Sequence, residues 1–298
     1  SKKETETLVA LTTISKASSN TAFYNSLKAA VGDNQDAALL FIHGFNVDFD
    51  SAVIRTAQLA VDLTYLDPDA AAADSYEFGQ PVLFSWPNGG VPYTYVDDRI
   101  LAELSARQLE TFLDELTARS GAKSINIIVH SMGNRVLVKA LETFVTGYSN
   151  NAPGDIEFKI IHAAADVDQQ VYDDVMDQIA RSQFKAEYTV YASSEDTPLQ
   201  ASRIVNAIIN AMQTARARVG QILDGKIYIR KSRNDKDMVT SIDATGFATD
   251  LFGHGYFSNA GNIIADISCN LAGFEPDERA LAPRKAEDGS DYWEADSS

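Results

Sequence analysis

An apolar, β-branched run near the middle of the chain ends at a histidine and a serine, and a helical pattern begins at once. The run covers 124–130, and the serine is Ser131. Apolar residues then recur at three- and four-residue spacing, which predicts an amphipathic helix over about 132–146. A turn this tight holds the serine hydroxyl out at the carboxyl edge of a sheet, and Gly133 leaves room for strand and helix to cross closely. The alternative is an ordinary helix start, because serine is a common N-cap residue.

Strand patterns alternate with helical patterns along most of the chain. The strands are predicted at 37–42, 81–85, 124–130, 157–163, 187–192 and 238–242, and the helices at 22–31, 51–66, 96–119, 132–146, 170–181, 199–219 and 262–271. This order predicts an α/β fold, with a mostly parallel central sheet and helices on both faces. No repeat or linker divides the chain, so we expect one domain over 1–298, with an N-terminal extension or edge strand at 1–21. We expect the acidic C-terminal tail, 275–298, to be a surface strap or to lack regular structure.

The composition argues against several classes of partner and site. The chain has 42 acidic and 25 basic residues and a formal net charge of −17, whereas binding to nucleic acid needs clustered Lys and Arg. Its one cysteine, Cys269, excludes an intrachain disulfide and a Cys-rich metal site. No two histidines stand at the helical spacing of metal ligands. We therefore expect no nucleic-acid partner and no metal.

Hydropathy and the first residues bear on location. No apolar run reaches about 18 residues, so we expect a soluble protein without a transmembrane segment. No signal peptide is visible, although the chain begins at Ser1 without a methionine. A cytoplasmic protein and an exported one whose leader is absent from this chain both stay open.

The positions of the histidines in the chain limit which of them could act as a base for Ser131. In open parallel sheets, ligands sit outside the carboxyl ends of the strands. A serine nucleophile there needs an imidazole base and a carboxylate that orients it. Of the four histidines, only His162 and His254 follow Ser131, as the chain order nucleophile, acid, base requires. His162 lies inside an apolar run and is expected to be buried and structural, whereas His254 stands between glycines in a loop. We predict His254 as the base.

The acid has three candidates. Asp196 follows the predicted strand 187–192 in a turn-like sequence, and we prefer it. Asp166 and Asp168 end the preceding strand and are the alternatives. Asp168 precedes a predicted helix, where aspartate is a favoured N-cap.

The oxyanion of an acyl-transfer reaction needs two donors. One is expected to be the backbone N–H of Met132, at the start of the predicted helix. The other is the N–H of Phe45, after the first predicted strand, where Gly44 lets the chain turn.

Other residues at the strand ends could surround a substrate. We place His43, Gly44, Trp86, Tyr93 and His130 there. His43 is expected to brace its loop rather than to transfer protons, and His130 to form a wall. Trp86 could equally pack the loop that carries it.

Five segments in order carry a resemblance to a known family. They are 41–46 (Phe-Ile-His-Gly-Phe-Asn), 84–87 (Phe-Ser-Trp-Pro), 129–135 (Val-His-Ser-Met-Gly-Asn-Arg), 165–168 (Ala-Asp-Val-Asp) and 254–256 (His-Gly-Tyr). On these residues the chain resembles the α/β hydrolases, and within them the DUF900 group. The resemblance implies serine hydrolase chemistry without a cofactor. Val129 replaces the first glycine of the superfamily's G-x-S-x-G pattern, and we expect it to crowd the turn without removing a catalytic atom.

These observations predict a serine hydrolase that cleaves a small or medium carboxylic ester through an acyl-enzyme. An amidase, a peptidase or an acyltransferase would use the same residues and differ in what enters the site. A non-catalytic binding module of the same fold is the other alternative. The predicted partner is a small-molecule ester, and the oligomeric state stays open.

Overall fold

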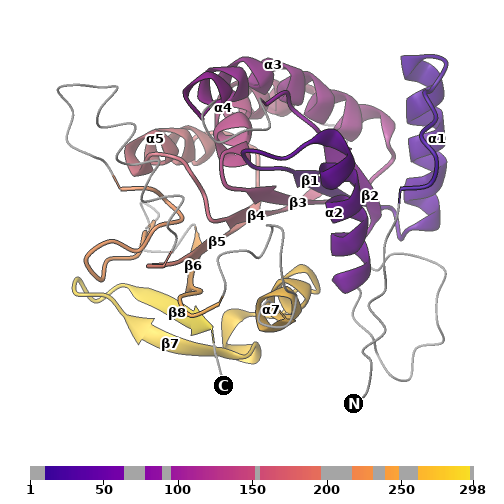
Figure 1. Cartoon of the computed structure of the whole chain (residues 1–298). Helices are drawn as coiled ribbons and strands as arrows, with labels where there is room; N and C mark the ends of the chain where they lie inside the picture. The colour runs from indigo at the N-terminus through magenta and orange to yellow at the C-terminus, as the bar shows by residue number, and fades with distance from the viewer. Residues whose placement is uncertain are drawn as a thin grey trace, which may run out of the picture.

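Eight strands form one sheet in the order β2-β1-β3-β4-β5-β6-β8-β7 (Figure 1). The computed structural model describes residues 11–63, 78–88, 95–151, 155–195, 217–230, 239–247 and 261–295. The strands are β1 Ala37–Ile42, β2 Gln80–Phe84, β3 Ser124–His130, β4 Glu157–Ala163, β5 Glu187–Ala192, β6 Thr240–Asp243, β7 Leu281–Lys285 and β8 Asp291–Ala295. Every neighbouring pair is parallel except β7 and β8. The predicted α/β fold with a mostly parallel sheet is confirmed.

Helices cover both faces of this sheet (Figure 1). They are α1 Asn20–Asp33, α2 Phe49–Asp62, α3 Tyr95–Arg119, α4 Gly133–Asn151, α5 Gln169–Ile179 and α7 Gly261–Leu271, followed by the 3₁₀ turn Pro276–Glu278. Helices α1, α3, α4 and α5 share one apolar cluster, and α2 and α7 share the other. Strand β1 contributes side chains to both clusters, because Leu40 packs into the first cluster and Leu39 into the second. Burial on both faces explains why β1 is a continuous apolar run in the sequence.

The direction of the connections reverses between β1 and β3. From β1 the chain passes through α2 to β2 on one side, and from β3 it passes through α4 to β4 on the other side. Helices α2 and α4 belong to opposite apolar clusters. In such sheets the reversal opens a crevice at the carboxyl ends of the two strands, and ligands bind there. Ser131 directly follows β3 and lies at this point.

Three predictions for the second half of the chain need correction. Residues 275–298 were expected to be a strap or irregular, but β8 pairs in parallel with β6 and β7 pairs with β8, so β6 is not the last strand. Strand β7 was not predicted because it contains a proline and charged residues, which are uncommon in strands. Both are tolerated here because β7 is an edge strand. The predicted helix 199–219 lies largely outside the described residues, and 217–219 are not helical. At the other end of the chain, residues 11–19 form neither helix nor strand, so the described part of the N-terminal extension contains no edge strand.

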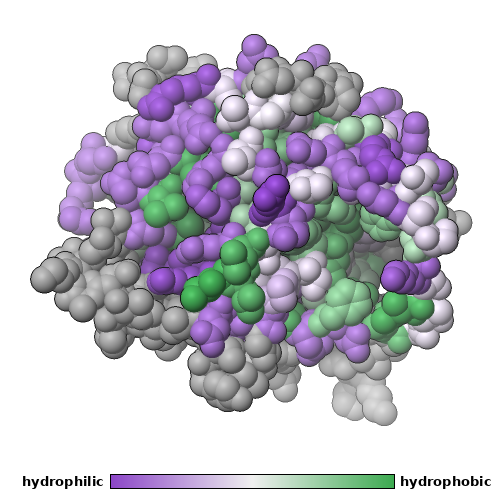
Figure 2. Space-filling view, turned by 90° about the horizontal axis from the view of Figure 1, so that it is seen from above, coloured by the Kyte–Doolittle hydropathy of each residue, from purple (hydrophilic) through white to green (hydrophobic). Residues whose placement is uncertain are grey.

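The view from above shows mostly hydrophilic side chains, with apolar ones scattered between them (Figure 2). In the part of the chain that the structure describes, no helix is long and apolar enough to cross a membrane.

A buried ion pair ties the C-terminal hairpin to α7. The guanidinium of Arg279 donates to both carboxylate oxygens of Asp266, each at 2.8 Å, and Tyr191 Oη donates to the same carboxylate at 2.6 Å. The side chains of Arg279 and Asp266 are 1% and 4% exposed. Burial of a charge is tolerated only with such full pairing, so this cluster holds α7 and the segment before β7 against β5.

Removal of the Arg279 charge is therefore expected to be costly. Arg279→Met leaves Asp266 buried without its cation and should lower the free energy of unfolding by about 3–5 kcal/mol. Urea unfolding followed by circular dichroism measures this change. Arg284→Met is the control, because Arg284 pairs with Glu294 on the surface and should cost less than about 1 kcal/mol. Equal losses in the two variants would contradict the structural role of the buried pair.

Candidate active site at the carboxyl ends of β1 and β3

Ser131 has a left-handed backbone, with φ of 47°, between the end of β3 and the start of α4. Its N–H donates to Ala163 O at 2.9 Å, and its carbonyl accepts from the N–H groups of Asn134 at 3.1 Å and Asp166 at 3.2 Å. A non-glycine residue in this region costs on the order of 1–3 kcal/mol and persists only where its surroundings enforce it. The sharp strand-to-helix turn predicted at Ser131 is present, and we call residues 129–134 the elbow.

Two glycines let the β1 loop and the elbow interlock. A Cβ on Gly133 would lie 2.4 Å from His43 O, and a Cβ on Gly44 would lie 2.7 Å from His130 Nδ1 and 3.1 Å from Ser131 Cβ. Both glycines are therefore needed for close approach. Gly44 has no positive φ in the structure, so its role is contact with the elbow rather than the turn that the sequence suggested.

Val129, which replaces the first glycine of the superfamily pattern, packs into the protein interior. Its side chain is fully buried in the apolar cluster that α4 shares. A branched residue therefore fits at the position where the superfamily pattern has glycine.

His43 braces the loop after β1, as expected. It is 1% exposed and stacks on Trp86, with ring centroids 5.3 Å apart. Its Nε2 accepts from the Trp86 N–H at 3.2 Å, so Nδ1 carries the proton and donates to Gly44 O at 2.9 Å. The indole of Trp86 donates to His43 O at 2.8 Å. Trp86 is 2% exposed, so the structure supports its packing role rather than the substrate contact suggested for His43 and Trp86.

His130 directly precedes Ser131 in the chain, and its side chain is mostly enclosed but still partly exposed. Burial of its imidazole, with smaller effects from Arg55 and His43, lowers the pKa of His130 to about 3. The ring is thus neutral near pH 7 and suits a wall rather than a base.

Two of the three candidate acids already have structural partners. Asp166 is 1% exposed and lies 3.3 Å from Arg135 Nη2 and 3.4 Å from Arg218 Nε. Asp168 caps α5, because its side chain accepts from the N–H of Gln170 at 2.9 Å. Asp196, His254 and Tyr93 lie outside the described residues.

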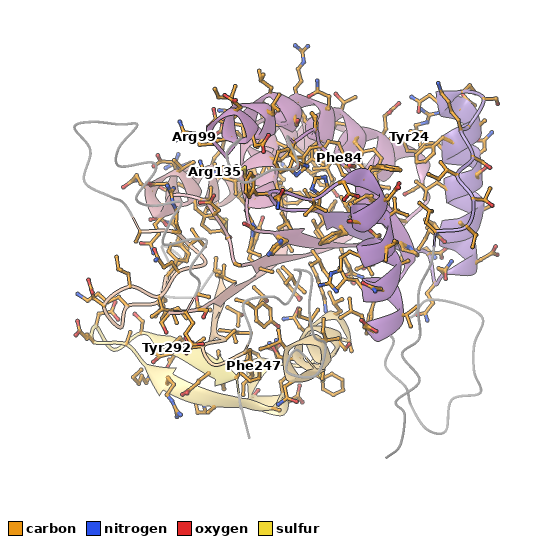
Figure 3. The ribbon with its side chains drawn as sticks, viewed as in Figure 1. Tyr24, Phe84, Arg99, Arg135, Phe247 and Tyr292 are labelled. Carbon is orange, nitrogen blue, oxygen red and sulfur yellow. The ribbon has the colours of Figure 1, made fainter. Side chains whose placement is uncertain are left out.

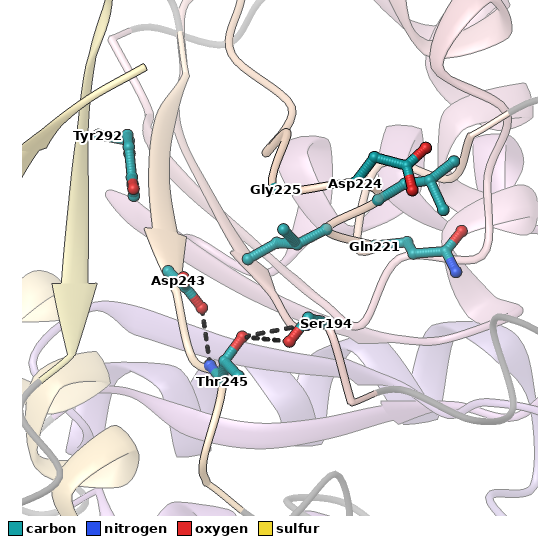
Figure 4. Close-up of a pocket in the computed structure, with 9 residues that line it drawn as sticks. Ser194, Gln221, Asp224, Gly225, Asp243, Thr245 and Tyr292 are labelled. Atoms are coloured by element: carbon teal, nitrogen blue, oxygen red, sulfur yellow. Dashed lines mark hydrogen bonds between the residues drawn. The ribbon is translucent and has the colours of Figure 1, made fainter. Parts of the chain in front are cut away.

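A polar hollow of about 610 Å³ opens farther along the same sheet (Figure 4). Its lining comes from the ends of β5 and β6, the loop 221–225 and β8: Ser194, Gln221, Ile222, Leu223, Asp224, Gly225, Asp243, Thr245 and Tyr292. Figure 3 shows Tyr292 and Arg135, which follows the elbow, in separate parts of the molecule. Strand β5 is two strands from β3, about 10 Å at ordinary strand spacing. The hollow is thus separate from the elbow, and its described lining includes none of His43, Gly44, Trp86 and His130.

This hollow was only weakly predictable from the sequence. Asp243 and Thr245 follow a predicted strand, as site residues do, but Tyr292 was assigned to the tail. Among the residues that the structure describes, no group of three or more His, Cys, Asp or Glu side chains is arranged to hold a metal.

Because Gly133 packs so closely against the loop after β1, a methyl group added at this position should lower the stability of the protein. Gly133→Ala forces Cβ against a backbone carbonyl that cannot rotate away, so the free energy of unfolding should fall by about 1–3 kcal/mol. The matched control is Gly147→Ala in the same helix, where nothing lies within 4 Å of the new Cβ. That variant should gain about 0.5–1 kcal/mol. Thermal unfolding of both variants tests the contact, which is refuted if Gly133→Ala is as stable as wild type.

Comparison with known families agrees with this geometry. A family model described as an α/β hydrolase of unknown function, DUF900, matches residues 15–270. Comparison with curated proteins gives no match. The matched range includes β1 to β6 and the elbow. The chain therefore belongs to the DUF900 family of α/β hydrolases.

Proposed function

We propose that the protein is a serine hydrolase with Ser131 as its nucleophile. The observation that carries this proposal is the left-handed backbone of Ser131 at the reversal point of a parallel sheet. Such strain costs stability, and it clusters at active sites, where it presents a side chain for reaction. A helix N-cap has no need of this conformation, because N-cap residues normally have extended backbone angles.

The oxyanion donors of the proposal are the backbone N–H groups of Met132 and Phe45. Met132 precedes the first residue of α4, where N–H groups lack intrahelical acceptors. Phe45 follows Gly44, whose backbone packs directly against Ser131. The interlocked glycines support this assignment, because they bring the β1 loop to the side of the nucleophile.

The base and the acid are His254 and Asp196. Strands β3, β4, β5 and β6 are consecutive and parallel, so their carboxyl ends share one edge. Asp196 follows β5 closely in the sequence, and His254 comes between β6 and α7. The helix-cap role of Asp168 and the ion pairs of Asp166 with Arg135 and Arg218 favour Asp196 as the acid.

The proposed reaction has two steps. Ser131 Oγ attacks the ester carbonyl while His254 accepts its proton, and the alcohol leaves with that proton. His254 then takes a proton from water, whose oxygen attacks the acyl carbonyl. The bond to Ser131 Oγ breaks, His254 returns the proton to Ser131, and the acid is released. Asp196 orients the imidazole in both steps. The substrate is a small or medium carboxylic ester.

Covalent labelling tests the nucleophile. Wild type should react with a fluorophosphonate probe at Ser131, located by peptide mass spectrometry, and Ser131→Ala should not be labelled. The Gly147→Ala variant is the control, since its change is remote from the elbow. Labelling of Ser131→Ala at the wild-type rate would refute the nucleophile. A panel of p-nitrophenyl esters of increasing chain length, with a matched anilide, separates an esterase from an amidase, and inertness toward the whole panel favours a binding module.

A pair of isosteric substitutions tests the acid. Asp196→Asn should lower kcat for the best ester by about 10²–10⁴, because the amide cannot stabilise the imidazolium. Asp168→Asn should keep kcat within about twofold, since asparagine caps a helix as well as aspartate does. Both variants are compared by initial rates at equal circular dichroism. If Asp196→Asn kept full turnover, the acid would have to be reassigned.

A further inference from the structure

A buried asparagine and histidine hold the carbonyl side of the elbow. Asn134, the second residue of α4, is fully buried, and its Nδ2 lies 3.0 Å from Ser131 O and 3.3 Å from Val129 O. Its Oδ1 lies 2.7 Å from Nδ1 of His162 in β4, which is also fully buried. One side chain thus joins the backbone on both sides of His130 to the neighbouring strand.

The hydrogen bonds of this pair have only one consistent direction. Two backbone carbonyls can only accept, so they must face the amide NH₂ of Asn134 rather than its oxygen. The oxygen therefore faces His162, and Nδ1 of His162 must carry the proton and donate it. Nε2 is left as a bare acceptor and has no hydrogen-bond partner in the described part of the chain.

The surroundings of His162 keep this arrangement in place. Its ring stacks on Tyr188, with centroids 6.3 Å apart, and meets the edge of Tyr172 at 5.2 Å. Burial in this cluster lowers the pKa of His162 to about 3, so the imidazole is neutral near pH 7. A neutral ring whose tautomer is fixed keeps Nδ1–H available as a hydrogen-bond donor to Asn134 Oδ1.

Strand β4 therefore supports the nucleophile at two adjacent residues. His162 lies opposite Val129 in the parallel register and reaches the elbow through Asn134. The next residue, Ala163, accepts from the N–H of Ser131. The N–H and the C=O of Ser131 are thus both held by contacts that lead to β4, which is the kind of enforcement that a left-handed serine needs.

We propose that Asn134 and His162 form a positioning pair that holds Ser131 in its reactive backbone conformation without touching the substrate. The proposal rests on Ser131 being the nucleophile. A pair that only stabilises the fold would change the unfolding midpoint, whereas a positioning pair also changes the reactivity of the folded enzyme. Displacement of a nucleophile by about 1 Å can cost on the order of 10²-fold in rate.

A series at His162 in the full chain separates these roles. His162→Leu removes the donor, whereas His162→Asn places an amide NH₂ near the position of Nδ1. Tyr188→Phe is the matched control, because it changes a ring in contact with His162 whose hydroxyl has no hydrogen-bond partner in the described part of the chain. Each variant is assayed for its second-order rate of fluorophosphonate labelling, well below its own unfolding midpoint.

We expect His162→Leu to label about 10- to 100-fold more slowly than wild type, with His162→Asn recovering most of the rate and Tyr188→Phe unchanged. Wild-type labelling by folded His162→Leu would overturn the proposal, whatever its unfolding midpoint. Should His162→Leu not fold, His162→Gln takes its place: its amide lies one methylene farther out, and labelling as fast as that of His162→Asn would overturn the proposal.

A measurement on wild type does not depend on folding of any variant. The ¹⁵N resonances of His162 should show a protonated Nδ1 and a bare Nε2, and the opposite tautomer would break the pair. Failure of the proposed function has a different signature, since wild type is then not labelled at Ser131 at all. The positioning pair fails when wild type is labelled and loss of the donor has no effect on the rate.

Discussion

The strained backbone of Ser131 is the feature on which the rest of the site depends. A serine with φ of 47° is unfavourable on its own, so several independent contacts must select it. The β1 loop presses on it from one side through Gly44, and β4 supports it from the other through Ala163. Parallel strands on both sides of β3 are therefore a requirement of the elbow, because only they bring a loop and a strand against the same residue.

The histidines of the described part of the chain are poorly suited to act as a general base near pH 7. Burial lowers the pKa of His43, and lowers those of His130 and His162 to about 3. A general base works best with a pKa near the operating pH. Neutral buried imidazoles with fixed tautomers are better suited to hold backbone carbonyls and amides in place. The lowered pKa values of His43, His130 and His162 thus leave His254 as the proposed base, the choice that chain order also favours.

The sequence predicted most of the sheet because a strand buried on both faces is a continuous apolar run, as in β1 and β3. It missed β7 and β8, whose proline and charges are permitted at a sheet edge but look like a tail. The serine turn was predictable because strand and helix periodicities meet there without a spacer. The Asn134–His162 contact was not, since its partners are 28 positions apart and neither periodicity nor composition joins them. Of these two residues, only His162 was predicted from the sequence, as a buried structural histidine.

The proposed site divides into two parts with different physical demands. The elbow and its oxyanion donors come from β1, β3 and α4, where close packing determines backbone positions to within a fraction of an ångström. The proposed acid and base follow β5 and β6, on longer connections that can carry different loops. A polar hollow opens beside those strands rather than at the elbow. Under the proposed function, the elbow supplies the nucleophile, and substrate preference should be sought in the β5 and β6 connections.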